Sequence, residues 1–78
     1  MTREEIFANL KEVIGIIRPG TDITNVTMDT ELVRGLGIDS LSMMLMALAI
    51  EEKFKMRFPP DSAPVTVSDV CDIILSAL

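Results

Sequence analysis

The sequence predicts an all-α fold, a bundle of three main helices and one short helix with a long loop after the first helix. Apolar residues recur at intervals of three and four along three separate stretches, which places them on one face of a helix. No stretch of useful length alternates apolar and polar residues, as a half-buried strand would. With 78 residues and no repeat or internal linker, the chain is predicted to form one small domain, residues 1–78.

The first helix is predicted from about Arg3 to Ile17. Thr2 and Glu5 have the spacing of a capping box, in which each side chain satisfies a free backbone N–H of the first turn. The apolar stripe of this helix consists of Ile6, Phe7, Leu10, Val13, Ile14 and Ile17. Pro19-Gly20 ends the helix.

Residues 18–38 are predicted to form a loop. Three apolar residues in it are expected to pack against the helices and hold the loop in place: Ile23, Val26 and Met28. A loop of this length is uncommon in so small a domain and is often functional. It ends at Asp39-Ser40.

The second helix is predicted from about Ser40 to Lys55, with Asp39 as its N-cap and Pro59-Pro60 preventing its continuation. It has two apolar faces. The first face consists of Met43, Met46, Ala47, Ile50 and Phe54. The second consists of Leu41, Met44, Leu45 and Leu48, with Glu52 at its far end. Since one face suffices for a three-helix core, the second is either buried as well or exposed as a docking surface.

The C-terminal part is predicted to contain a short turn and the last helix. The turn is expected at Asp61 to Pro64, and the helix after Thr66, where Thr66-Val67-Ser68-Asp69 is a second capping-box pattern. The apolar stripe of this helix consists of Val67, Val70, Cys71, Ile74, Leu75 and Leu78. Cys71 is therefore expected to be a buried structural thiol.

The composition limits the classes of partner that the chain is expected to bind. Twelve acidic against seven basic residues give a net charge of −5, which argues against nucleic-acid binding. The longest apolar run, Met43 to Ile50, is too short to span a membrane, and the N-terminus does not resemble a signal peptide. A single Cys agrees with a reducing compartment, so a cytoplasmic location is expected. The chain is expected to be a monomer. No metal site is expected, because the loop carboxylates lack the spacing of an EF-hand.

The segment Leu36-Gly37-Ile38-Asp39-Ser40-Leu41 brings a hydroxyl to the start of the second helix, with a carboxylate beside it. The chain has no His, and Cys71 is far away in sequence, so Ser40 lacks a visible general base. We therefore expect no catalytic residue. A serine that another enzyme modifies fits better than a nucleophile.

These residues resemble an acyl carrier protein. The family signature Leu-Gly-x-Asp-Ser-Leu stands here as residues 36–41, and Glu51-Glu52-Lys53-Phe54, Pro59 and the Thr66–Val70 helix start also fit. The resemblance covers essentially the whole chain and implies a four-helix acyl-carrier-like bundle. It further implies that Ser40 carries a 4′-phosphopantetheine arm, installed from coenzyme A by a phosphopantetheinyl transferase using magnesium. The thiol of the arm would hold acyl groups as thioesters for acyl-transfer and ketosynthase-type enzymes.

One departure from the family pattern concerns the second helix. In the common fatty-acid type its exposed face is strongly acidic, whereas Ser42 and Leu45 stand here at positions where acidic residues are typical. We therefore hypothesise a specialised fatty-acid or polyketide-type carrier whose partners read a more apolar surface. The expected partner-recognition residues are Asp39, Leu41, Met44, Leu45, Leu48, Glu51 and Glu52.

Two alternatives stay open at the level of sequence. One is an aminoacyl or peptidyl carrier, although Gly37-Ile38-Asp39 favours the acyl type; D-alanyl carriers also present Asp-Ser. The other is an unmodified helical adaptor that binds a partner through the Met/Leu stripe. An autonomous enzyme has the least support.

Overall fold

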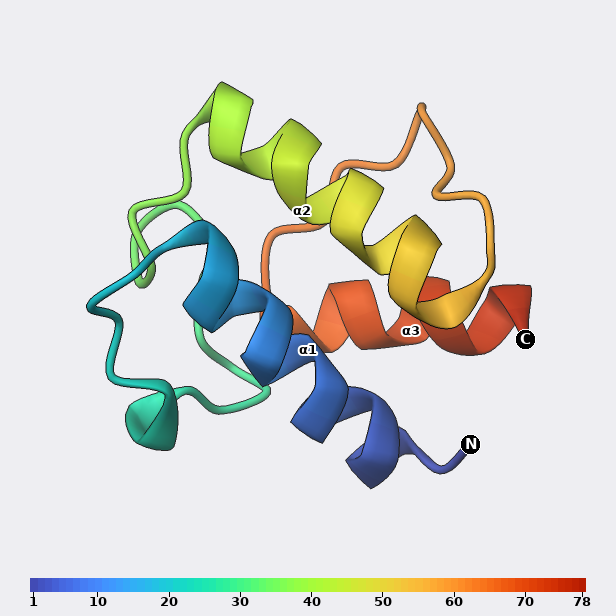
Figure 1. The fold of residues 1–78 in the computed structure, drawn as a ribbon, viewed down its shortest axis with the longest axis horizontal. Coiled ribbons are helices and arrows are strands. Elements are labelled where there is room, and N and C mark those ends of the chain that lie inside the picture. Colours follow the sequence, from blue (N-terminus) through green and yellow to red (C-terminus); the bar gives the residue numbers. More distant parts are fainter.

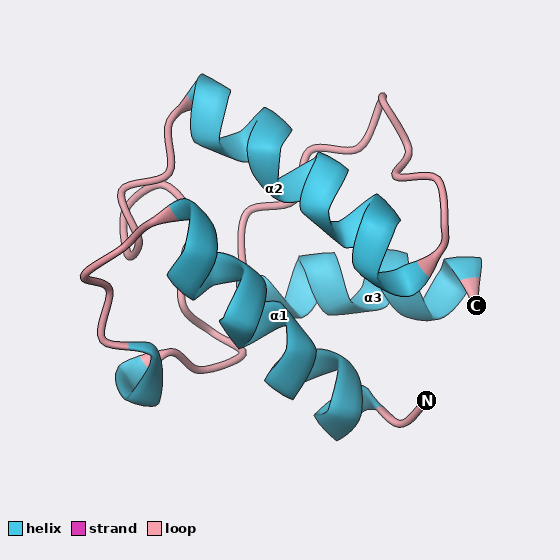
Figure 2. Cartoon of the chain, viewed as in Figure 1, coloured by secondary structure: helices cyan, strands magenta, loops and turns pink.

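The computed structural model describes residues 1–78. It contains three α-helices, α1 (Arg3–Ile17), α2 (Ser40–Phe54) and α3 (Val67–Ala77), and one 3-10 turn, η1 (Ile23–Asn25). Figure 2 shows helices joined by loops without a strand; the one isolated bridge joins Glu31 to Thr66. The all-α prediction is confirmed, and so are the three main helices.

The helices pack around one apolar core. α1 contacts both α2 and α3, and Figure 1 shows α1 and α2 running side by side in opposite directions. The C-terminal end of α1 therefore lies near the N-terminal end of α2. No polar or charged residue is buried. The core consists of Ile6, Leu10, Val13, Ile14, Val26, Leu32, Leu36, Ile38, Met46, Ile50, Phe54, Val67, Val70, Cys71 and Ile74.

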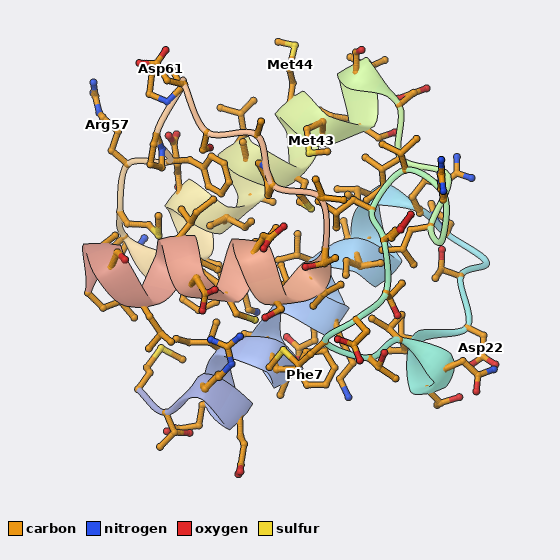
Figure 3. The ribbon with its side chains drawn as sticks, turned by 180° about the vertical axis from the view of Figure 1, so that it is seen from behind. Phe7, Asp22, Met43, Met44, Arg57 and Asp61 are labelled. Carbon is orange, nitrogen blue, oxygen red and sulfur yellow. The ribbon has the colours of Figure 1, made fainter.

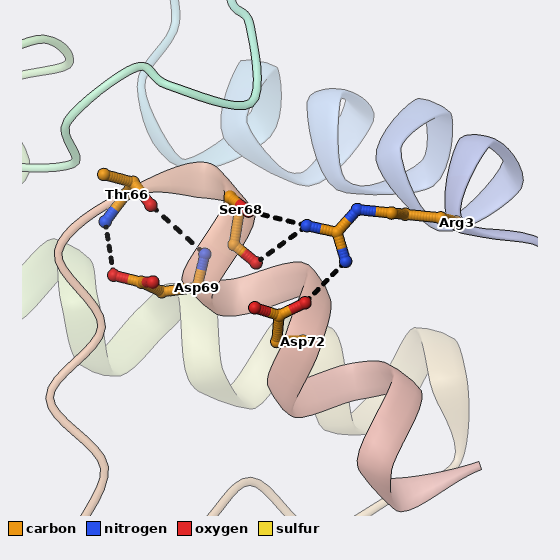
Figure 4. A network of polar contacts seen from close by, with 5 residues as sticks. All are labelled: Arg3, Thr66, Ser68, Asp69 and Asp72. Atoms are coloured by element: carbon orange, nitrogen blue, oxygen red, sulfur yellow. Dashed lines mark hydrogen bonds and ion pairs between the residues drawn. The ribbon is translucent and has the colours of Figure 1, made fainter.

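Local signals fix where α1 and α3 begin. Both predicted capping boxes form, at Thr2 with Glu5 and at Thr66 with Asp69. Arg3 then joins the two helices: its guanidinium pairs with Asp72 and donates to the Ser68 hydroxyl at 2.6 Å (Figure 4). Because this pair is partly exposed, it contributes orientation more than stability.

The one short helical element is η1, and it does not lie at residues 61–64, where the sequence predicted a short turn. The 3-10 turn stands inside the first loop, where the Asp22 carboxylate accepts from the Thr24 N–H and from the Asn25 side chain. The segment after α2 instead contains a single turn over residues 59–62, closed by the Ser62 N–H, which donates to the Pro59 carbonyl at 3.3 Å. The prolines of this segment, Pro59, Pro60 and Pro64, remove the N–H donors that a helix requires.

The first loop is more ordered than its composition indicates. Val26 is buried as predicted, while Ile23 and Met28 are half-buried. Three further loop residues enter the core that the sequence reasoning did not assign to it, Leu32, Leu36 and Ile38. The Leu32 N–H donates to the Val65 carbonyl at 2.9 Å, and its carbonyl accepts the Ile38 N–H at 3.0 Å. The chain just before Ser40 is thereby fixed to the rest of the fold.

Two glycines are expected to respond in opposite directions to the same substitution. A methyl group on Gly35 would lie 2.6 Å from the carbonyl oxygen of Glu31, so the backbone must shift. We expect Gly35→Ala to lower the free energy of unfolding by about 1–3 kcal/mol. Gly15 lies inside α1, and a methyl group on it would have its nearest neighbour at 3.7 Å, an ordinary contact. We therefore expect Gly15→Ala to raise the free energy of unfolding by about 0.5–1 kcal/mol.

Urea unfolding of both glycine variants beside the parent chain measures these changes. A Gly35→Ala variant as stable as the parent would contradict the tight packing of residues 31–37.

Candidate functional site

The site is built on the start of α2. The Asp39 carboxylate accepts the Ser42 N–H at 2.8 Å, and the Asp39 carbonyl accepts the Met43 N–H at 2.8 Å. Asp39 is therefore the N-cap, as predicted, and Ser40 is the first residue of the helix.

Ser40 presents its hydroxyl to solvent. The residue is exposed, and neither its own N–H nor the Leu41 N–H has a hydrogen-bond acceptor within the chain. Free N–H groups and the helix dipole favour an anion at this position. The chain contains no His, and the Asp39 carboxylate beside Ser40 accepts the Ser42 N–H.

Gly37 and Arg18 shape the approach to Ser40. Gly37 has a φ of 68°, in the left-handed region that favours glycine. The space that a Cβ would fill is bordered by the Arg18 guanidinium, whose Nη2 would lie 3.1 Å away. The Ser42 hydrogen bond lowers the pKa of the Asp39 carboxyl, and the positive charge of Arg18 adds a smaller effect in the same direction.

Acid is expected to weaken the fold through its capping carboxylates. Backbone N–H donors lower the pKa values of Glu5, Asp39 and Asp69 from their ordinary values of 4.5, 3.8 and 3.8. The unfolded chain therefore takes up protons first as pH falls. This contribution to stability is present above these ordinary values and is lost as pH falls through the lower folded ones.

We expect the urea midpoint to decline below about pH 4.5, the ordinary pKa of the least acidic of these groups. The decline should be shallower in Asp39→Asn, which keeps a capping oxygen but cannot titrate. An equally steep decline in that variant would show that Asp39 does not contribute.

An open apolar groove of about 470 Å³ begins at Ser40. One wall is α2, with Met43, Ala47 and Glu51, and the other is the segment Phe58–Pro64. Another hollow, of about 340 Å³, is bordered by Val33 and Ile38 from the loop that leads into α2. Ser40 and Met43 border both, so a group attached to Ser40 can enter either one.

The second apolar face of α2 is exposed, which answers the question that the sequence left open. We call Leu41, Met44, Leu45 and Leu48 the exposed stripe; their exposed fractions are 65%, 64%, 45% and 60%. In Figure 3 the Met44 side chain projects away from the fold. The opposite face is the buried one, through Met46, Ile50 and Phe54.

The two acidic residues at the end of α2 differ in their surroundings. Glu51 is half-buried and borders the groove, where its carboxylate accepts the Phe58 N–H at 2.8 Å. Glu52 is exposed and lies 3.6 Å from Lys55. Glu52 is thus available to a partner, whereas Glu51 also holds the far wall of the groove.

Two parts of the site were not predicted from the sequence, namely Arg18 and the groove wall formed by residues 58–64. Arg18 ends α1, and nothing in its neighbours indicates that it lies against Gly37. The run Phe58-Pro59-Pro60 signals a break in the helix, but not its return along α2. Arg34 lies just before the segment 36–41; it is exposed, and its guanidinium lies 3.8 Å from the Glu31 carboxylate.

Comparison with known proteins identifies the class of this site. The family model described as phosphopantetheine attachment site matches residues 4–74. The chain is 36% identical to the acyl carrier protein of Coprothermobacter proteolyticus over 80 residues, covering 100% of this chain and 96% of that protein. It is 35% identical to that of Acidothermus cellulolyticus over 79 residues, covering 99% and 93%. It is 33% identical to that of Myxococcus xanthus over 78 residues, covering 97% and 98%.

The fold and the matching family model are those of a phosphopantetheine-dependent carrier. The chain belongs to the acyl carrier protein family, whose members carry 4′-phosphopantetheine and are carriers rather than enzymes. Such carriers interact with a transferase and with biosynthetic enzymes. None of the helices is both long and apolar enough to cross a membrane.

Proposed function

We propose that Ser40 is the residue that carries the arm, through a phosphodiester at its Oγ. This proposal rests on the exposed Ser40 hydroxyl, which stands at the first position of α2 beside two N–H groups without acceptors. The N–H of nearby Ser42 is already bound by Asp39. The Ser62 N–H donates to the Pro59 carbonyl, and the Ser68 N–H donates to the Met28 carbonyl. These serines lack the free N–H groups that favour a phosphate.

The residues around Ser40 fit a phosphodiester-linked arm. When bound, the arm supplies the thiol that forms acyl thioesters. Ser40 anchors it, Asp39 fixes the start of the helix, and the apolar groove offers a surface along which the arm can lie. The transferase brings the base and metal for attachment, so the carrier requires neither.

We further propose that the carrier serves a specialised fatty-acid or polyketide-type pathway. Ser42 and Leu45 support this proposal because they replace charge on the helix that follows the arm. The holo chain is expected to accept acyl groups from acyl-transfer enzymes and to refuse aminoacyl groups. Intact mass after incubation with each donor and its loading enzyme tests this; charging by D-alanine or another amino acid alone would favour the aminoacyl carrier class.

The exposed stripe is proposed as the surface that partner enzymes read, together with Asp39, Glu51 and Glu52. It begins at Leu41, directly beside Ser40, and it offers no charge along about two turns of α2. An interface of this kind depends on apolar burial, so its affinity should depend only weakly on salt.

Binding of the holo chain to a ketosynthase from the same organism, measured at rising salt, tests this surface. Leu45→Glu is expected to weaken binding roughly tenfold or more, since it places a charge into an apolar contact. Leu78→Glu, which alters an exposed apolar residue at the other end of the chain, is the control. A steep loss of parent affinity with salt, or equal effects of both variants, would contradict the proposal.

We also propose that residues 1–78 act as a single monomeric carrier domain in the cytoplasm. The free thiol of Cys71 supports a reducing compartment, and burial raises its pKa, which keeps it protonated and inert.

A further inference from the structure

Arg18 is a cation without a partner beside the proposed attachment site. It is exposed, and no carboxylate lies within 4.0 Å of it. Arg57 also lacks an ion pair, but it follows the far end of α2 (Figure 3). The remaining basic side chains have partners, namely Arg3 with Asp72, Lys11 over the Phe7 ring, Arg34 with Glu31, Lys53 with Glu12 and Lys55 with Glu52.

The antiparallel packing of α1 and α2 explains where Arg18 lies. It is the C-cap of α1, and that end of α1 lies on the same side of the fold as the start of α2 (Figure 1). Its guanidinium lies against Gly37, three residues before Ser40, with Nη2 3.1 Å from the position that a Cβ on Gly37 would take, which would be a tight contact. The absence of a side chain at Gly37 thus lets a positive charge come close to the approach to Ser40.

A phosphodiester on Ser40 creates an electrostatic conflict that such a charge can relieve. It places an anion next to the Asp39 carboxylate in a chain of net charge −5. The Asp39 carboxylate is held close to Ser40, because it accepts the Ser42 N–H as the N-cap of α2. The free N–H groups of Ser40 and Leu41 are donors but carry no full charge. A guanidinium offers both a charge and paired donors that match phosphate oxygens.

We propose that Arg18 is a positioning residue for the arm, pairing its guanidinium with the phosphodiester on Ser40. The pairing offsets the repulsion between that phosphate and Asp39 and restricts the direction in which the arm leaves the helix. This inference rests on the proposed role of Ser40. It concerns the isolated holo chain, so it does not depend on any partner enzyme.

The test compares apo and holo forms of the parent, Arg18→Gln and Arg57→Gln. Phosphorus NMR of the holo forms reports the environment of the phosphodiester. In Arg18→Gln its resonance should move toward the position seen in urea-unfolded holo chain, and added salt should move the parent resonance the same way. Arg57→Gln should leave the resonance where it is in the parent.

Urea unfolding supplies a second readout. Arg18→Gln should lower the ratio of holo to apo folding constants by roughly two- to fivefold, the range for one exposed ion pair. Unchanged resonance and ratio in this variant would overturn the inference. An effect confined to the rate of arm attachment would also overturn it, because Arg18 would then contact the transferase instead. A parent chain that acquires no phosphorus signal would overturn the proposed role of Ser40 itself.

Discussion

Replacing Ser40 by alanine is expected to abolish the transfer of phosphopantetheine to this chain, while Ser42→Ala leaves the transfer intact. Both serines lie in the first turn of α2, but only Ser40 is exposed at the free N–H groups of the helix start. Removing its hydroxyl removes the only oxygen at that point to which the phosphate can be joined. A fluorescent coenzyme A analogue with a broad-specificity transferase measures the transfer.

The Ser40→Ala chain should remain folded, because its side chain caps nothing and is not part of the core. Its urea midpoint is therefore expected to match that of the parent. Labelling that persists in Ser40→Ala, or that disappears in Ser42→Ala, would contradict the assignment of the attachment site.

Leu32→Ala is expected to have the largest effect on stability, lowering the free energy of unfolding by about 2–5 kcal/mol. Leu32 is fully buried, and its backbone joins the loop to Val65 and Ile38. A domain of this size has roughly 5–10 kcal/mol to lose. The segment that leads into Ser40 should loosen first, since its contacts converge on this side chain.

Val33→Ala is the matched control, because the neighbouring Val33 is 64% exposed and should cost less than about 0.5 kcal/mol. Urea unfolding of both variants gives the comparison. A Leu32→Ala variant no less stable than Val33→Ala would contradict the position of this loop in the core.

The helices could be predicted from sequence because their signals are local. Thr2, Asp39 and Thr66 each stand before an apolar periodic run, and each proves to be an N-cap. The exposure of Leu45 could not be predicted, since two apolar faces fit a buried helix equally well. Only the packing of α1 on the Met46 and Ile50 face decides between them.

The loops were harder to predict, for a physical reason. Leu32, Leu36 and Ile38 enter the core from an irregular backbone, so their spacing shows no period that sequence could reveal. The groove wall and the contact of Arg18 with Gly37 likewise depend on segments distant in the chain. The proposed attachment site could be chosen from sequence because the motif and the start of the helix coincide at Ser40.

The most direct measurement is the location of the added group on the parent chain. The chain is first treated with transferase and coenzyme A. Cleavage on the C-terminal side of Arg34 and Lys53 then releases a peptide of residues 35–53, which contains both Ser40 and Ser42. Fragmentation of this peptide in a mass spectrometer should place one phosphopantetheine per chain on Ser40. A chain that stays unmodified while a known acyl carrier protein is fully converted, or a group found on any other residue, would contradict the account.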